Sequence, residues 1–256
     1  MSFQIKGMTI GEGQPLICVP VMGETEEEIV RQASHLIEKG AKMIEWRVDA
    51  FAGAFDMNAL RQVLTALAPI VSDTILVYTF RSKAQGGLRP ATAEELYDIH
   101  QIAAETDVAD MIDVEFFASG KVAKEVRTLQ KMGARVIASH HDFDETPDPG
   151  VMQTILEKMA KSGADIVKLA VMPKHETDVL SLLFVTTAFR EHYPTVPCIT
   201  MSMGSEGVIS RVAGEWFGSC VTFGAGEQAS APGQLPMEKL QHILDTLHEA
   251  RCAGKA

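Results

Sequence analysis

Along the whole chain, short apolar runs typical of buried strands alternate with segments whose apolar positions have the period of a helix. Short runs rich in Val, Ile and Leu, such as residues 74–81 and 165–171, predict buried strands. Each run precedes a segment whose apolar residues recur every three or four positions, as in residues 24–40 and 120–133, which predicts an amphipathic helix. Eight such pairs occur, with strands predicted at residues 16–22, 43–49, 74–81, 110–116, 135–142, 165–171, 196–203 and 219–224.

This alternation predicts a parallel sheet, because a parallel strand is reached through a crossover that is usually a helix. Eight pairs in 256 residues match the size of one (β/α)8 barrel. An open doubly wound sheet is the alternative, but residues 21–28 lack GxGxxG and no Walker motif occurs. We therefore predict an α/β fold, a single TIM-barrel domain over residues 1–256, with a short N-terminal hairpin that caps the barrel bottom.

Composition excludes several classes of function. The chain has 34 acidic and 23 basic residues, a net charge of −11 and no basic run, so we expect no nucleic acid partner. No apolar run approaches the roughly 20 residues of a membrane helix, so we expect no membrane span. The four cysteines are scattered, and the N-terminal residues lack the pattern of a signal peptide. We therefore expect a reduced, cytoplasmic protein.

The carboxyl ends of the predicted strands carry many polar residues. Active sites of TIM barrels lie at this end, where side chains from several strands meet. Glu45, Arg47 and Asp49 alternate along one strand and share one face, so we expect them to point into the barrel mouth. The full set at the strand ends and in the following loops is Glu45, Arg47, Asp49, Arg81, Asp113, Glu115, His140, His141, Lys168, Arg211, Ser230 and Gln234.

Lys168 interrupts an apolar strand, and two interpretations account for it. One is an ion pair with Glu45 or Asp113. The other is a Schiff-base lysine, because an apolar wall and neighbouring cations make an amine nucleophilic at neutral pH. His140 and His141 alternate in direction on the preceding strand, so we expect only one of them in the site. Carbonyl chemistry after imine formation needs such a group to move protons near pH 7.

Arginines indicate the charge of the substrate. Arg47, Arg81 and Arg211 come from three different strands, and converging guanidinium groups suit a carboxylate or a phosphate. The usual Gly-rich phosphate loop at a helix start is missing after the last two strands, which favours a carboxylate.

A metal site is the alternative use of the acidic residues. Carboxylate and imidazole groups bind divalent cations, but three arginines and a lysine in the same mouth would oppose the charge of a metal. The residues concerned are Asp49, Asp113, Glu115 and His141. We expect no metal and no cofactor.

Seven motifs occur in order along the chain: EWRVD, TFRS, HDF, GADIVKLAVMP, ITMSMGSEGVISR, FGSCVTFG and ASAPGQ. Together they resemble the successive strand-end motifs of type I 3-dehydroquinate dehydratases, over a region from about Glu12 to Leu247. One motif alone would be unspecific, whereas seven in order are highly specific. The resemblance implies a TIM-barrel lyase of the shikimate pathway that converts 3-dehydroquinate to 3-dehydroshikimate, forms a homodimer and needs no cofactor or metal.

The resemblance also implies roles for matching positions. Lys168 matches the Schiff-base lysine, and His141, rather than His140, matches the general acid and base. Lys168 would condense with the C3 ketone, and His141 would remove the C2 proton and then protonate the departing C1 hydroxyl. The residues that match substrate-binding positions are Glu45, Arg47, Arg81, Arg211, Ser230 and Gln234.

Gln85 departs from the pattern of the resembled family. The family carries a glutamate before the paired glycines that follow TFRS, whereas this sequence reads RSKAQGG. That glutamate pairs with the catalytic histidine, and a glutamine can form a hydrogen bond there but carries no charge. We therefore expect His141 to have a lower pKa than the family norm, and turnover to be reduced but not abolished. The alternatives are that Gln85 is a natural variant and another carboxylate takes the role of the glutamate, or that Gln85 is an introduced change that traps an intermediate. A second departure is Pro20, to which we assign no role.

Two other functions stay open from the sequence. A class I aldolase-type barrel also carries a Schiff-base lysine, but it makes or breaks a carbon–carbon bond and often binds phosphate, whereas a dehydratase generates a conjugated enone. A non-catalytic carboxylate-binding barrel would bind its ligand without forming product. The segment containing Gly204, Ser205 and Gly207 has the composition of a mobile cover, so we also predict a lid there.

Overall fold

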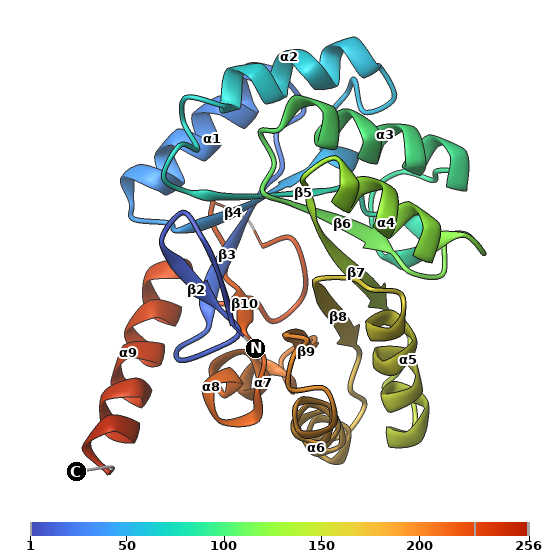
Figure 1. Cartoon of the computed structure of the whole chain (residues 1–256). Coiled ribbons are helices and arrows are strands. Elements are labelled where there is room, and N and C mark those ends of the chain that lie inside the picture. Colours follow the sequence, from blue (N-terminus) through green and yellow to red (C-terminus); the bar gives the residue numbers. More distant parts are fainter. Residues whose placement is uncertain (1, 228, 255–256) are drawn as a thin grey trace.

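The computed structural model describes residues 2–227 and 229–254. Within them, eight strands form one sheet in which all hydrogen-bonded neighbours are parallel, in the order β10-β3-β4-β5-β6-β7-β8-β9 (Figure 1). These strands are β3 (Leu16–Val21), β4 (Met43–Arg47), β5 (Ile75–Thr79), β6 (Met111–Glu115), β7 (Arg135–His141), β8 (Ile166–Val171), β9 (Cys198–Ser202) and β10 (Val221–Phe223).

The sheet curls until its two edge strands meet. Ser219, just before β10, forms a parallel bridge with Cys198 of β9, and the Cys220 amide donates to the Cys198 carbonyl at 2.9 Å. The strands therefore form a nearly closed barrel rather than an open sheet, and the TIM-barrel prediction is confirmed. Closure also removes the exposed edges through which open sheets pair with other chains.

Helices follow every strand of the barrel and pack against its outside. Their starts agree with local chemistry: the Thr25 hydroxyl accepts the Glu28 amide, and Thr92 forms a capping box with Glu95. The helices are α1 (Glu26–Glu38), α2 (Met57–Leu67), α3 (Ala93–Thr106), α4 (Val122–Lys131), α5 (Pro149–Lys161), α6 (Glu176–His192), α7 (Val208–Val212), α8 (Gly214–Phe217) and α9 (Met237–Ala253).

The segment after β9 differs from the sequence prediction. The alternation of strands and helices predicts one helix over residues 207–218, between the last two strands, but the chain forms the two short helices α7 and α8, with Ala213 between them. The second of them starts at Gly214, where the backbone lies so close to Ser219 that a Cβ would be 2.5 Å from its carbonyl oxygen. Position 214 therefore has to be glycine for the second helix to pack against the residues that lead into β10.

Two apolar layers hold the barrel together. Ile44 and Trp46 of β4 point outward into the core between strands and helices, whereas Met43 points to the barrel axis. The same alternation sends Glu45 and Arg47 inward at the carboxyl end of the strand, and both are buried.

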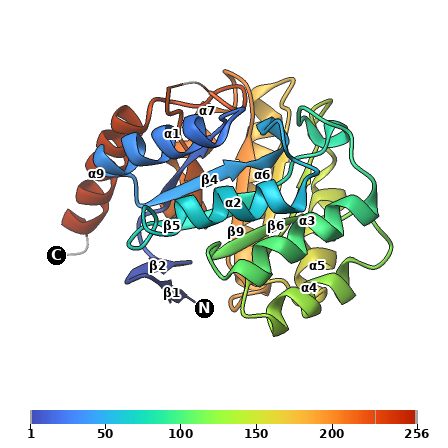
Figure 2. The ribbon, with the colours of Figure 1, turned by 90° about the horizontal axis from the view of Figure 1, so that it is seen from above.

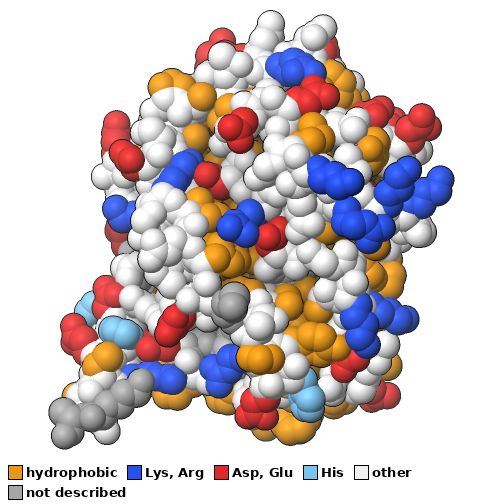
Figure 3. All heavy atoms as spheres, viewed as in Figure 1, with side chains coloured by type: hydrophobic (Ala, Val, Ile, Leu, Met, Phe, Trp, Pro, Cys, Tyr) orange, Lys and Arg blue, Asp and Glu red, His pale blue; other side chains and the backbone are white. Residues whose placement is uncertain are grey.

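On the outer surface, acidic and basic side chains are interspersed over the face that Figure 3 shows.

A hairpin closes the end of the barrel where the strands begin (Figure 2). It pairs β1 (Phe3–Ile5) with β2 (Met8–Ile10) in antiparallel register, and its two-residue turn has positive φ angles of 48° at Lys6 and 76° at Gly7. Ile10 packs among residues that start the barrel strands, so the predicted N-terminal hairpin is confirmed.

None of the helices in the described residues is sufficiently long and apolar to cross a membrane.

Candidate active site

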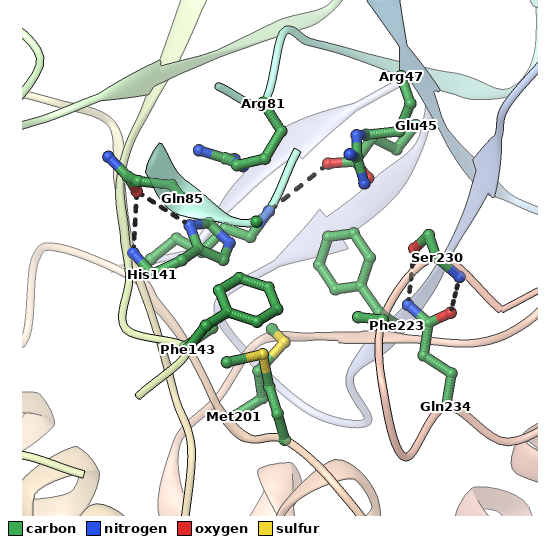
Figure 4. A pocket seen from close by; sticks show the side chains of 15 residues that line it. Glu45, Arg47, Arg81, Gln85, His141, Phe143, Met201, Phe223, Ser230 and Gln234 are labelled. Carbon is green, nitrogen blue, oxygen red and sulfur yellow. Dashed lines mark hydrogen bonds and ion pairs between the residues drawn. The ribbon is translucent and has the colours of Figure 1, made fainter. Parts of the chain in front are cut away.

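A cavity opens at the carboxyl ends of the barrel strands (Figure 4). It encloses about 440 Å³ including its open mouth, a size suited to a small metabolite. All residues to which the resemblance gave a catalytic or substrate-binding role line it except Arg211, whereas Asp49, Asp113, Glu115 and His140 of the wider predicted set do not. Its wall consists of Glu45, Arg47, Arg81, Gln85, Gly86, His141, Phe143, Lys168, Ala170, Met201, Met203, Phe223, Ser230, Ala231 and Gln234.

Lys168 on β8 reaches this cavity from inside the barrel. Its neighbours Val167 and Leu169 face the helices, so strand alternation points the lysine to the axis, where it is 4% exposed. Its Nζ lies 3.1 Å from Asp113 Oδ2 and 3.5 Å from Glu45 Oε1. The same nitrogen lies 4.4 Å from the centre of the Phe223 ring. The ion pair expected as one interpretation of Lys168 is therefore present, beside the apolar wall that the other interpretation requires.

Asp113 on β6 is the centre of a buried polar network under the cavity. Arg81 Nη2 donates to its Oδ1 at 2.7 Å, and the Ser139 hydroxyl donates to the same oxygen at 2.5 Å. Arg81 Nη1 also donates to Glu115 Oε1 at 3.1 Å. Burial alone would raise the pKa of a carboxyl, but Arg81 and Lys168 outweigh it and hold the pKa of Asp113 well below its ordinary value.

Arg47 is held at the cavity wall by a second buried carboxylate. Its Nε and Nη2 both donate to Asp49 at 2.8 Å, which is the bidentate geometry that fixes a guanidinium plane. Asp49 also accepts the backbone amides of Arg81 and Leu88, so it ties the loop after β5 to this arginine. Burial raises the pKa of Asp49, but the bonds from Arg47 outweigh it and leave that pKa lowered.

The acidic residues weighed as metal ligands are therefore engaged by cations. Asp49 pairs with Arg47, and Asp113 pairs with Arg81 and Lys168. In residues 2–227 and 229–254, no three His, Cys, Asp or Glu side chains are grouped as a metal site requires.

His141 and Gln85 face each other across the cavity rim. The backbone amide of His141 donates to Gln85 Oε1 at 2.9 Å, and His141 Nδ1 lies 3.3 Å from the same oxygen. Because a backbone amide can only donate, the atom it meets must be the oxygen of the glutamine. That oxygen can in turn only accept, so Nδ1 carries the proton and the free Nε2 has the lone pair of a base.

The glycines after Gln85 let it approach His141. A Cβ on Gly86 would lie 2.2 Å from the Phe143 ring, and a Cβ on Gly87 would lie 1.8 Å from the Arg81 carbonyl oxygen. The loop therefore needs glycine at both positions to fit under Phe143 and against the end of β5. This packing buries Gln85 beside the imidazole of His141.

The environment of His141 favours the neutral imidazole. Burial, and next to it the charges of Arg81 and Lys168, lower the pKa of His141 well below its ordinary value. His140 does not line the cavity: it packs edge-on against Phe117 at 4.9 Å on the other side of the strand. The geometry thus favours His141 over His140 as a base that reaches a ligand.

Arg211 lies behind the cavity wall instead of in it. Its Nη2 donates to the Pro232 carbonyl at 2.9 Å, and its Nη1 lies 3.7 Å from the sulfur of Met201. The side chain is 1% exposed, and Nε has no hydrogen-bond partner among the described residues. Burial lowers the pKa of Arg211 to about 10. A buried guanidinium with no carboxylate beside it is costly, and it marks a place where an anion would be stabilised.

Ser230 and Gln234 lie in the loop before α9 and bind each other. The Ser230 amide donates to Gln234 Oε1 at 2.9 Å, and Gln234 Nε2 donates to the Ser230 hydroxyl at 3.0 Å. A Cβ on Gly233 would lie 2.1 Å from the Gly204 carbonyl oxygen, so this loop touches the segment predicted as a lid. The closing motion of that segment stays a prediction.

Sequence reasoning missed two residues of the site. Ser139 connects Asp113 to Arg81, and Phe143 lies near the His141 ring with centroids 6.5 Å apart. Both lie two positions from His141, and in a strand that spacing returns to the same face. The alternation of the strand and its continuation was therefore the signal that could have identified them.

Known proteins resemble this chain over nearly its full length. The family model of type I 3-dehydroquinases matches residues 17–251. A 3-dehydroquinate dehydratase of Clostridium botulinum is 42% identical over 247 residues, covering 96% of this chain and 97% of the relative. One from Clostridioides difficile is 40% identical over 248 residues, with 96% and 97% covered.

Solved structures agree with the sequence relatives. The crystal structure of a type I 3-dehydroquinate dehydratase from Clostridium difficile, with covalently modified comenic acid, superposes with a TM-score of 0.93 at 40% identity and 98% coverage of both chains. The 3-dehydroquinate dehydratase of Geobacillus kaustophilus superposes with a TM-score of 0.94 at 33% identity, covering 97% of each chain.

Proposed function

Because this chain belongs to the type I 3-dehydroquinase family, we propose that it dehydrates 3-dehydroquinate to 3-dehydroshikimate through a Schiff base on Lys168. The activity that its relatives carry, 3-dehydroquinate dehydratase, is a lyase activity of the shikimate pathway. The observation that carries the mechanism is that a buried lysine and a histidine whose pKa is lowered by burial lie in the wall of one cavity. These two groups are the ones that imine chemistry at a ketone requires.

The reaction begins when Lys168 condenses with the C3 ketone and water leaves. The resulting iminium withdraws electrons from C2, so the C2 proton becomes acidic. Nε2 of His141, which Gln85 leaves with its lone pair free, takes that proton and an enamine forms. The imidazolium then protonates the departing C1 hydroxyl, and hydrolysis of the imine releases the product.

The remaining polar residues bind the substrate in this proposal. Arg211, together with Ser230 and Gln234, receives the carboxylate and ring hydroxyls. Its guanidinium has no carboxylate partner among the described residues, and the side chain turns from behind the wall into the cavity when the substrate binds. Glu45, Arg47 and Arg81 orient the ring. The buried partners of the two latter arginines hold both guanidinium groups in place before the substrate arrives.

Replacing Arg211 by methionine separates binding from stability. We expect Arg211→Met to raise the KM for 3-dehydroquinate by roughly 10- to 100-fold, the size of a lost charge-assisted hydrogen bond. The thermal unfolding midpoint should stay or rise, because a buried unpaired cation is replaced by an apolar group of similar length. Steady-state kinetics and a melting curve measure both quantities.

The matched control for this variant is Arg81→Met. Arg81 is also buried, but it pairs with Asp113 and Glu115, so its loss takes the arginine cation from two buried carboxylates, of which only Asp113 keeps a second cation, Lys168. We expect its melting midpoint to fall. A fall of the midpoint in Arg211→Met as large as in Arg81→Met, with unchanged KM, would contradict an anion-binding role for Arg211.

Restoring a charge at position 85 should change the pH dependence of turnover. Because the pKa of His141 is lowered, its imidazole stays neutral at pH values below the ordinary pKa of histidine. The acid limb of the kcat/KM profile therefore lies at low pH. In Gln85→Glu a carboxylate next to Nδ1 stabilises the imidazolium, so the acid limb moves up by about 1–3 pH units. A stronger base also raises kcat near neutrality by roughly tenfold.

A pH–rate profile of both enzymes measures this effect. Gln234→Glu is the control, since it adds the same charge to the same cavity without a contact to His141, and it should move the limb less. Equal profiles for the chain with Gln85 and for Gln85→Glu would mean that Gln85 does not set the basicity of His141.

The absorbance of a conjugated enone tests the function itself. Incubation with 3-dehydroquinate should produce this ultraviolet absorption, because loss of water places a double bond next to the ketone. Products of carbon–carbon cleavage would indicate the aldolase alternative. Saturable binding without product would indicate the non-catalytic alternative.

Three expectations stay predictions: the homodimer, the single-domain organisation of residues 1–256 and the cytoplasmic location. Sedimentation velocity tests the homodimer.

A further inference from the structure

Asp113 is in contact with the reacting nitrogen although it does not line the cavity. Its side chain is 0% exposed. Oδ1 is occupied by Arg81 at 2.7 Å and by the Ser139 hydroxyl at 2.5 Å. Oδ2 is left to accept Lys168 Nζ at 3.1 Å. Two donors on one oxygen fix the carboxylate, so the other oxygen is aimed at the amine.

The charge at Nζ is the same before and after condensation. The ammonium and the ketone combine to the protonated imine and one water molecule: two N–H hydrogens leave with the ketone oxygen, and the nitrogen keeps one hydrogen and its positive charge. An anion placed for the ammonium therefore also stabilises the iminium, without any rearrangement of the protein. Such preorganised charge is a large source of catalysis in buried sites.

Two carboxylates lie near Nζ, and the structure distinguishes them. Glu45 lines the cavity, where the substrate enters, and its Oε1 is 3.5 Å from Nζ while it accepts the Thr79 hydroxyl at 2.9 Å. Asp113 is closer and lies away from the cavity. An iminium carries a single N–H hydrogen, so it can form a well-aligned hydrogen bond with only one of the two carboxylates.

We propose that Asp113 accepts the N–H of the Lys168 iminium and is the counter-ion that keeps this imine protonated. This inference rests on the proposed Schiff-base function. Protonation matters because the cationic iminium draws electrons from C2, whereas a neutral imine does so weakly. When the C2 proton moves to His141, the positive charge leaves Nζ for the imidazole, and Asp113 attracts charge there too.

Other charged and titratable groups surround the pair. From the strands packed around it, they are Cys18 on β3, Glu45 and Arg47 on β4, Arg81 after β5, Glu115 on β6 and His141 on β7. Arg81 is a fixed cation and opposes protonation of the imine. Asp113 therefore has to balance two cations, Arg81 and the iminium on Lys168. If its negative charge is removed, Arg81 is no longer balanced and lowers the pKa of the imine.

The pH limit of imine trapping tests the counter-ion. Cyanoborohydride reduces iminium ions much faster than neutral imines, so the yield of trapped adduct on Lys168, measured by mass spectrometry, reports the protonated fraction. In Asp113→Asn we expect the high-pH limit of this yield to move down by about 1–3 pH units. In Asp113→Glu, which keeps the charge, much of the natural limit should return.

Glu115→Gln is the matched control. Glu115 is as buried as Asp113, lies two residues away on the same face of β6 and binds the same arginine, but it has no contact with Nζ. Its change should move the limit less than Asp113→Asn does. Ser139→Ala, which removes one donor to Asp113 without a change of charge, should produce a smaller downward shift of the limit, and it serves if Asp113→Asn does not fold.

The outcomes distinguish this inference from the proposed function. If the natural enzyme gives no adduct on Lys168, the Schiff-base mechanism itself fails. If the enzyme is trapped but the high-pH limit of trapping shifts equally in Asp113→Asn and Glu115→Gln, the counter-ion assignment is overturned. If Asp113→Asn does not fold, an unchanged high-pH limit in Ser139→Ala overturns it instead.

Discussion

Lys168→Arg is expected to lose turnover by at least about 10⁴-fold, the largest effect of any single change, because it removes the nucleophile of a covalent mechanism. A guanidinium stays protonated and cannot form an imine with a ketone. It does keep a cation between Asp113 and Glu45, so the buried network that holds the lysine is not left with uncompensated carboxylates. Initial rates of enone formation and mass spectra after reduction measure the two consequences.

Lys168→Met is the companion of this variant. It removes both the nucleophile and the charge, so it should lose activity to the same extent and also lower the melting midpoint, since Asp113 and Glu45 lose their cation. If Lys168→Arg kept turnover within tenfold of the natural enzyme, the lysine would act only through its charge. In that case the ion-pair interpretation of Lys168 would be sufficient.

His141→Ala should have the second largest effect, a loss of kcat of roughly 10²- to 10⁴-fold, which is the usual contribution of a positioned acid and base. The two half-reactions should separate in this variant. Lys168 is untouched, so reduction with borohydride should still attach the ligand, although enone formation is slow. Rapid-mixing absorbance and intact-chain mass spectra follow both steps.

His140→Ala provides the control for this result. The two histidines are neighbours in sequence, but His140 packs on Phe117 behind the strand and does not reach the cavity. Turnover of this variant should stay within a few-fold of the natural enzyme once its folded fraction is accounted for. An equal loss in both variants would indicate that the changes act through the packing of β7 instead of through proton transfer.

The fold could be predicted from the sequence because its signal is repeated. Eight changes from a strand period to a helix period, with no linker between them, leave few architectures, and the missing GxGxxG disfavours the open sheet. The break between α7 and α8 was not predictable in this way. It lies beside a close contact between Gly214 and Ser219, and local periodicity carries no information about a contact made in three dimensions.

The site was predictable where strand alternation decides the direction of a side chain. Glu45, Arg47 and Lys168 are examples, since a parallel strand that is buried on both faces shows its inward-facing polar residues clearly. Arg211 lies in a helix after β9, and the Pro232 carbonyl and the Met201 sulfur set its direction. Its place behind the wall therefore depends on strand β9 and on the loop before α9, which meet only in the folded chain.

The two interpretations of Lys168 turn out to be compatible. The lysine is an ion-pair member, with Asp113 at 3.1 Å and Glu45 at 3.5 Å, and it also lies in the wall of the cavity. Condensation with a ketone conserves the charge at Nζ, so a carboxylate that pairs with the ammonium does not have to be displaced. Sequence alone presented these as alternatives because it does not show how many partners a buried group has.

Trapping of the natural enzyme tests the central claim most directly. The protein is incubated with 3-dehydroquinate, reduced with borohydride and digested, and the peptides are examined by mass spectrometry. We expect a ligand-sized mass gain on the peptide that contains Lys168 and on no other lysine peptide. Enone formation without any adduct on Lys168 would contradict the Schiff-base account.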